Sequence, residues 1–285
     1  VRPSDNLILS GLRAGISRPL TDDDIQKAAQ AAADAETAIV CVGRSGEWDT
    51  EGSDLTSIAL PGRQDDLISA VLAANPRTVI VLQTGGPVEM PWLDRASTVL
   101  QAWYPGQEAG NSIADVLFGD ADPGGRLPQT FPKRWQDNPT WTQDLSIYPG
   151  LDGQVRYEEG VFIGYRHYEK HGITPMFPFG FGLSYAAFEL SDVCAQATDD
   201  GVQVSATLTN ISQRAGSTVV QVYVGEDRPE VARPMRELKG FQKIVLDAKA
   251  SAKVNIGLFS LYLGLSSVDI RGSVQIARPA ATIEV

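Results

Sequence analysis

AIVCVGRSGEWDTEGSDLTSIAL, residues 38–60, is the stretch that decides the fold of this chain. It opens with the apolar run AIVCV at 38–42, which Gly43 ends. A helix-like segment precedes this run, and the pattern is typical of a fully buried strand in a parallel sheet. A loop with four carboxylates and an indole follows. Its members are Glu47, Trp48, Asp49, Glu51 and Asp54.

This acidic loop is expected at the carboxyl end of a parallel strand, where loops of open α/β sheets line the ligand crevice. Several acids and an indole at such a point favour a site that handles protons and a flat, hydroxyl-rich ligand. Acid-rich loops are also common as plain solvated surface. Spacing alone therefore leaves both interpretations open.

The segments around the loop predict an α/β domain. Thr21 is the expected N-cap of a first helix, because three aspartates follow it in the first turn. Pro61 is expected to start a second helix that ends before Asn75. Further strands are predicted at 78–83 and 97–103, and a third helix at 107–118. Strands that alternate with helices predict a parallel sheet with helices on its faces.

The second half has a different pattern. Residues 120–184 read as a long connection with little regular structure, and alternating apolar residues then predict short strands. Strands are expected at 202–208, 218–224, 240–246, 252–256 and 258–263. They predict an all-β, immunoglobulin-like sandwich. The predicted parts are a lead-in at 1–20, the α/β domain at 21–130, a connecting segment at 131–187 and the sandwich at 188–285.

Composition excludes several classes of function. A net charge of −11 argues against nucleic acid and anionic membranes as partners, and no apolar run approaches the roughly 18 residues of a membrane span. Cys41 and Cys194 lie in apolar runs far apart, so we expect buried free thiols. The two histidines, His167 and His171, have no cysteine nearby, and we expect no metal site and no cofactor. The turn at 43–46 has neither Walker nor dinucleotide spacing, which argues against an unrelated nucleotide-binding domain.

Eight short motifs complete the sequence evidence. In chain order they are EWDTEGSD (47–54), LPGRQ (60–64), GPVEMPW (86–92), AWYPGQE (102–108), ADVLFGD (114–120), YEEG (157–160), GYR (164–166) and FPFGFGLSY (177–185). With this ordered set the chain resembles the C-terminal part of glycoside hydrolase family 3, in particular the fungal β-glucosidases.

The resemblance implies a catalytic barrel, an α/β sandwich domain and a fibronectin type III-like domain. In this family the nucleophilic aspartate lies on the barrel. The resemblance implies that Glu51 occupies the position of the family's general acid/base glutamate. Retaining glycosidases need two such carboxyls about 5–5.5 Å apart. Glu47, Trp48 and Asp54 are expected to bind substrate or shape the site, or else only to shape the loop.

The expected activity is that of a retaining, exo-acting β-glucosidase that needs the missing N-terminal barrel fragment as its partner and a β-glucoside or oligosaccharide as substrate. The alternatives are a β-xylosidase or xyloglucan-oligosaccharide hydrolase of the same family, or a non-catalytic carbohydrate-binding remnant. A remnant is disfavoured because Glu51 stands in an intact TEG-x-D setting. The sequence leaves homo-oligomer formation open.

Three positions depart from the family pattern. Leu55 stands where arginine is common, and Phe181 stands where histidine is common, a change that packing could absorb. Ile256 and Gly257 are joined directly where the family carries an extra aromatic segment.

Two features bear on processing. The chain has no initiator methionine, so we expect a processed piece of a longer protein. The sequon at Asn210 predicts N-glycosylation and, with it, secretion, with an intracellular location as the alternative.

Overall fold

The computed structural model describes residues 18–51, 54–198, 201–225, 229, 231–258, 261–264, 270–277 and 282–284. It divides into two compact units between Ala109 and Gly110. Most of the predicted lead-in at 1–20 lies outside the described residues, and the predicted boundaries at 130 and 187 stay predictions. Within the described part, no helix is long and apolar enough to cross a membrane. No group of three or more metal-binding side chains occurs there either.

The first unit begins with α1 (Asp22–Ala33), whose start is fixed by a capping box. The Thr21 hydroxyl accepts a hydrogen bond from the Asp24 amide at 3.3 Å, and the Asp24 carboxylate accepts one from the Thr21 amide at 2.9 Å. Two of the amide donors that a helix start leaves unpaired are thereby satisfied. The predicted N-cap is confirmed.

Three parallel strands form the sheet of this unit, in the order β1-β2-β3. They are β1 (Ala38–Gly43), β2 (Thr78–Gln83) and β3 (Thr98–Gln101). In the central strand Ile80, Val81 and Leu82 are fully buried. In β1 only alternate residues are buried, since Val40 is 7% exposed and Ile39 is 49% exposed. The prediction that β1 is buried on both faces is therefore wrong.

The cysteines need a related correction. Cys41 and Cys194 are free, as expected, but both are exposed. Cys41 shares the open face of β1 with Ile39. An apolar run alone could not distinguish a strand buried on both faces from one buried on a single face.

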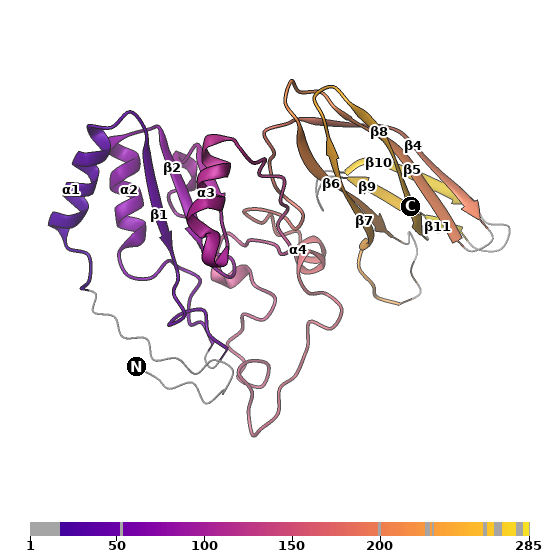
Figure 1. Cartoon of the computed structure of the whole chain (residues 1–285). Helices are drawn as coiled ribbons and strands as arrows, with labels where there is room; N and C mark the ends of the chain where they lie inside the picture. Colours follow the sequence, from indigo (N-terminus) through magenta and orange to yellow (C-terminus); the bar gives the residue numbers. More distant parts are fainter. Residues whose placement is uncertain are drawn as a thin grey trace. The chain divides into compact units, whose positions relative to one another are not determined.

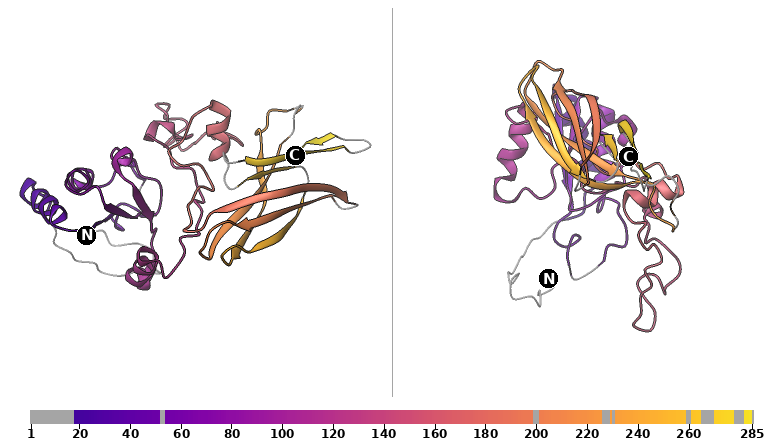
Figure 2. Two further views of the ribbon diagram at one scale, coloured as in Figure 1. Left: turned by 90° about the horizontal axis from the view of Figure 1, so that it is seen from above. Right: turned by 90° about the vertical axis from the view of Figure 1, so that its right-hand side faces the viewer.

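Helix α2 (Gln64–Ala74) packs on β1 and β2, and α1 packs on α2 (Figures 1 and 2). The helix starts three residues after Pro61, because the chain first turns at Gly62 with φ of +63°. At its end the side-chain nitrogen of Asn75 donates to the carbonyls of Ala32 and Ala35, which ties the end of α1 to that of α2. Helix α3 (Ala109–Phe118) begins at the last residue of the first unit.

After α3, a long connection in the second unit has only two short helices among its described residues, η3 (Trp135–Asp137) and α4 (Tyr165–His171). Two further 3-10 turns, η1 (Leu93–Arg95) and η2 (Gly106–Glu108), belong to the first unit. Residues 127–131 pair with the FPFG segment, since the Leu127 amide donates to the Phe181 carbonyl and the Phe131 amide to that of Phe177. The Phe181 ring lies 5.0 Å from the Phe177 ring, so packing accommodates the phenylalanine at this position.

Asp122 attaches this connection to the sandwich. Its carboxylate accepts hydrogen bonds from the hydroxyl of Ser184, the amide of Tyr185, and both the amide and the hydroxyl of Ser217. Ser217 belongs to the sandwich strand β6 (Gly216–Val224). One carboxylate therefore joins three points that are far apart in the sequence.

The rest of the unit is the predicted antiparallel sandwich. One sheet has the order β4-β5-β8, with β4 (Phe188–Thr198), β5 (Gly201–Asn210) and β8 (Ser251–Leu258). The other has the order β11-β10-β9-β6-β7, with β7 (Glu237–Leu246), β9 (Leu261–Gly264), β10 (Ile270–Ala277) and β11 (Thr282–Glu284). The core alternates along β5 as predicted, with Val202, Val204, Ala206 and Leu208 all buried. The Ile256–Gly257 joint lies inside β8, opposite Val204 and Gln203.

Asn210 does not fit the predicted glycosylation. The residue is fully buried, and its side-chain nitrogen donates to the carbonyls of Arg214, Leu246 and Asp247. This nitrogen is the atom that would carry the glycan, and in the folded chain it is neither accessible nor free. A glycan on this nitrogen would displace these three hydrogen bonds, and secretion stays a prediction.

Candidate active-site loop

The acidic loop leaves the sheet at Gly43, where β1 and β2 come unusually close. A Cβ at this position would lie 2.1 Å from the carbonyl oxygen of Gln83, so only glycine fits. The Gln64 side chain fixes the same residue from α2, accepting from the Gly43 amide at 2.7 Å and donating to the Gly43 carbonyl at 2.9 Å. The start of the loop is therefore held by a strand and by a helix.

Arg44 closes the base of the loop. Its side chain is only 1% exposed, and one guanidinium nitrogen donates to the carbonyls of Ile58 at 2.8 Å and Pro87 at 3.3 Å. Another guanidinium nitrogen lies 3.5 Å from the Asp49 carboxylate. The guanidinium thereby ties together both ends of the loop and the turn after β2.

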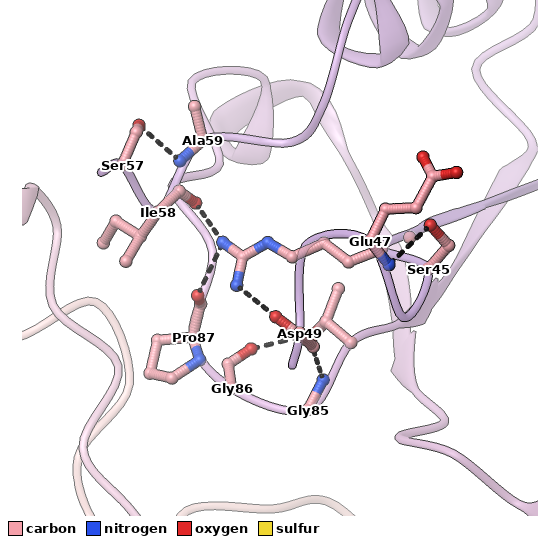
Figure 3. A network of polar contacts seen from close by, with 12 residues as sticks. Ser45, Glu47, Asp49, Ser57, Ile58, Ala59, Gly85, Gly86 and Pro87 are labelled. Atoms are coloured by element: carbon pink, nitrogen blue, oxygen red, sulfur yellow. Dashed lines mark hydrogen bonds and ion pairs between the residues drawn. The ribbon is translucent and has the colours of Figure 1, made fainter. Parts of the chain in front are cut away.

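Asp49 is the second anchor (Figure 3). Its Oδ2 accepts hydrogen bonds from the Gly85 amide at 2.8 Å and from the Tyr104 hydroxyl at 2.5 Å. Burial, together with the hydrogen bond to Asp49, raises the pKa of Tyr104 to about 12. The phenol is therefore protonated at neutral pH and acts as the donor.

The four residues singled out from the sequence lie on the outside of this loop. Glu47, Trp48, Glu51 and Asp54 are all exposed. None of their three carboxylates forms an ion pair with another described side chain, and Figure 3 shows the Glu47 side chain turned away from Asp49. Glu51 follows Asp49 by two residues and is exposed.

The sequence interpretation missed the anchors Arg44, Gly85 and Tyr104, and it gave Asp49 no role of its own. A signal for them was present. Gly85 follows β2 and Tyr104 follows β3 within a few residues, so both belong to the same sheet edge as the acidic loop. Loops after every strand of a parallel sheet line its carboxyl edge, so these two residues were predictable neighbours of the acidic loop.

This arrangement can present a carboxylate at a fixed place, but it does not dehydrate that carboxylate. A general acid must hold its proton near the working pH, which requires partial removal from water. Glu51 is exposed in the described chain. Acid catalysis at Glu51 therefore requires a second surface against the loop.

The comparisons with known proteins fit this geometry. The model of the glycosyl hydrolase family 3 C-terminal domain matches residues 3–185, which is more than half of the chain. The chain belongs to glycoside hydrolase family 3. The model of a fibronectin type III-like domain matches residues 218–273 of the sandwich.

The family 3 relatives are β-glucosidases by name. The chain is 47% identical to a β-glucosidase of Rhizobium radiobacter, over 96% of the chain and 37% of that protein. The solved β-glucosidase of Kluyveromyces marxianus in complex with glucose has a TM-score of 0.84 and 42% identity, over 90% of this chain and 33% of that one. DesR, a β-glucosidase from Streptomyces venezuelae in complex with D-glucose, has the same TM-score at 37% identity, over 93% of this chain and 35% of that one. The chain spans little more than a third of the length of these relatives.

Proposed function

We propose that this chain is the C-terminal portion of a retaining, exo-acting β-glucosidase and that Glu51 is its general acid/base. The observation that carries the proposal is the loop itself: an exposed glutamate stands two residues after Asp49, the anchor that fixes the loop to the sheet. The β-glucosidase names of the family 3 relatives support the substrate class.

The partner that completes the site is the N-terminal barrel portion of the same enzyme. A retaining mechanism requires a second carboxyl about 5–5.5 Å from the acid, to act as nucleophile. The relatives are more than twice as long as the part that this chain matches, which leaves room for such a domain. Contact with the barrel would remove water from Glu51 and favour its protonated form.

In the first step Glu51 gives its proton to the glycosidic oxygen while the barrel nucleophile attacks the anomeric carbon. The bond to the leaving group breaks, and a covalent glycosyl-enzyme forms. In the second step the Glu51 carboxylate takes a proton from water, and the water oxygen displaces the nucleophile. Glucose leaves with its configuration retained, and both carboxyls return to their starting states.

Glu51→Ala in the full-length enzyme tests this proposal. Cellobiose has a poor leaving group that needs a proton, so we expect kcat/KM to fall by about 10²–10⁴-fold. The dinitrophenolate of a dinitrophenyl glucoside leaves without a proton, so the first step with this substrate should slow far less. The glycosyl-enzyme should then accumulate. Azide needs no deprotonation, so it should restore turnover and yield a β-glycosyl azide.

Glu47→Ala serves as the comparison, because Glu47 is another carboxylate on the same loop. Azide rescue in Glu47→Ala instead of Glu51→Ala would assign the acid role to Glu47. A Glu51→Ala enzyme that is equally slow on both substrates, with no azide product, would contradict the proposal.

A further inference from the structure

The support under the acidic loop is more extensive than an exposed surface loop requires. The Arg44 side chain is 1% exposed and the Asp49 side chain 15% exposed, although the residues between them are exposed. Burial of charged groups is costly unless they are paired and hydrogen-bonded. A buried arginine–aspartate contact at the base of a solvated loop therefore calls for an explanation.

Three chain segments that follow successive strands meet at Asp49. The segment after β1 contributes Arg44, the turn after β2 contributes the Gly85 amide, and the segment after β3 contributes the Tyr104 hydroxyl. Both carboxylate oxygens are used, Oδ1 toward Arg44 and Oδ2 toward the other two groups. The Asp49 carboxylate is thus held by the segments that follow all three strands of the sheet, and Figure 3 shows its contact with Gly85.

The space around Gly85 is tightly packed. A Cβ added at Gly85 would lie 3.0 Å from the Tyr104 ring and 3.1 Å from Oδ2 of Asp49. At these distances a side chain at position 85 would push the Tyr104 ring or the Asp49 carboxylate aside by a few tenths of an ångström. The acceptor, its two donors and the guanidinium therefore form one close-packed cluster.

We propose that Asp49 is a positioning residue for Glu51, holding the loop so that the Glu51 carboxylate projects from a fixed point at the sheet edge. This inference rests on the proposed function of Glu51. Only Thr50 separates the anchor Asp49 from the acid Glu51, so a displaced Asp49 moves the backbone that carries Glu51. A misplacement of about 1 Å in a reacting group can cost on the order of 10²-fold in rate.

Asp49→Asn in the full-length enzyme is the direct test. Asparagine has the same shape, but its NH₂ group cannot accept from the Gly85 amide and the Tyr104 hydroxyl as the carboxylate does. We expect kcat/KM for cellobiose to fall on the order of 10–10²-fold, and the first step with a dinitrophenyl glucoside to fall by about threefold or less. Azide should not restore turnover as it does in Glu51→Ala, because the Glu51 carboxylate is still present.

Asp65→Asn is the matched control. Asp65 lies on α2 and accepts a hydrogen bond from the Trp92 ring nitrogen at 2.8 Å, so this variant also removes a carboxylate acceptor from the same unit. It should slow the reaction of both substrates by the same factor or leave both unchanged.

Tyr104→Phe removes only the hydroxyl that donates to Asp49, and it should give a smaller loss with the same dependence on the leaving group. Tyr104→Phe also decides the question if Asp49→Asn does not fold.

Two outcomes would overturn the inference in distinguishable ways. If Glu51→Ala shows the leaving-group dependence but neither Asp49→Asn nor Tyr104→Phe does, Asp49 has no positioning role and the function of Glu51 stands. If Glu51→Ala itself lacks that dependence, the proposed function fails and the role of Asp49 fails with it.

Discussion

Asn210 closes the corner of the sandwich at the end of β5. Its side-chain nitrogen is shared by three carbonyls, and its side-chain oxygen accepts from the Ser212 amide at 2.9 Å. Those three carbonyls belong to residues 214, 246 and 247, so one amide holds β5 to the ends of two connections. A buried group with several such bonds is expensive to remove, because its partners stay behind unpaired.

Asn210→Ala should therefore destabilise the sandwich. Each lost hydrogen bond is worth about 0.5–1.5 kcal/mol and the abandoned carbonyls add to the cost, so we expect a loss of roughly 2–4 kcal/mol in the free energy of unfolding. Urea unfolding followed by fluorescence measures the change. Asn255→Ala, at an exposed position on β8, is the control and should stay within about 0.5 kcal/mol of the parent. Equal stability of the two variants would contradict this account of Asn210.

Single residues also show where the sequence was informative. Thr21 was predictable as a cap because its partner Asp24 lies three residues away. The role of Asn210 was not, because the sequon describes two neighbours while its real partners lie up to 37 residues away. The anchoring role of Asp49 was not predictable for the same reason, since its donor Tyr104 is 55 residues distant.

At the scale of elements, the contact between the connection and β6 depends on the charge of Asp122. Burial alone would raise the pKa of Asp122, but the hydrogen bonds from Ser184, Ser217 and Tyr185 outweigh it, so the pKa lies below its ordinary value. The ionised carboxylate therefore favours the folded state. This contribution is present above the unfolded pKa of about 3.9 and is lost as the pH falls through the lower folded value.

Asp122→Asn should lower stability at neutral pH and weaken the loss of stability on acidification below about pH 4. Thermal unfolding between pH 7 and pH 3 measures both effects. Ser184→Ala removes one donor and should give a smaller change in the same direction. If the parent and Asp122→Asn lose stability with the same slope over this range, the charge of Asp122 does not hold the connection in place.

Strand β4 shows why some elements could not be predicted. Phe188 and Leu190 pack against the core, and so do Val193 and Ala195. The spacing changes by one residue because a bulge lies between Ser191 and Cys194. An alternation of period two is interrupted there, whereas β5 has no such interruption and was predicted.

At the scale of the whole chain, two compact units each carry their own buried residues. The acid/base proposed here stands on one of them, while the nucleophile is expected on a domain that the chain does not contain. Folding and catalysis should therefore be separable properties of this polypeptide.

The isolated chain should not hydrolyse aryl β-glucosides, because no glycosyl-enzyme can form without the nucleophile. Mixing it with the separately produced N-terminal portion should restore turnover, and the two should copurify. Release of nitrophenol and size-exclusion chromatography measure these outcomes. Turnover by the chain alone, unaffected by a covalent inhibitor of the barrel nucleophile, would show that the chemistry lies elsewhere.

The outer position of β1 has a practical consequence for work with this chain. Among the described residues β1 pairs only with β2, so its other edge is free of strand partners, and Ile39 is exposed beside it. Its sequence AIVCVG contains no charge and no proline. The unpaired backbone groups of such an edge can pair with the same strand edge of another copy of the chain. Overproduction of the chain alone should therefore favour inclusion bodies over soluble protein, and one lysine in place of Ile39 would discourage that aggregation.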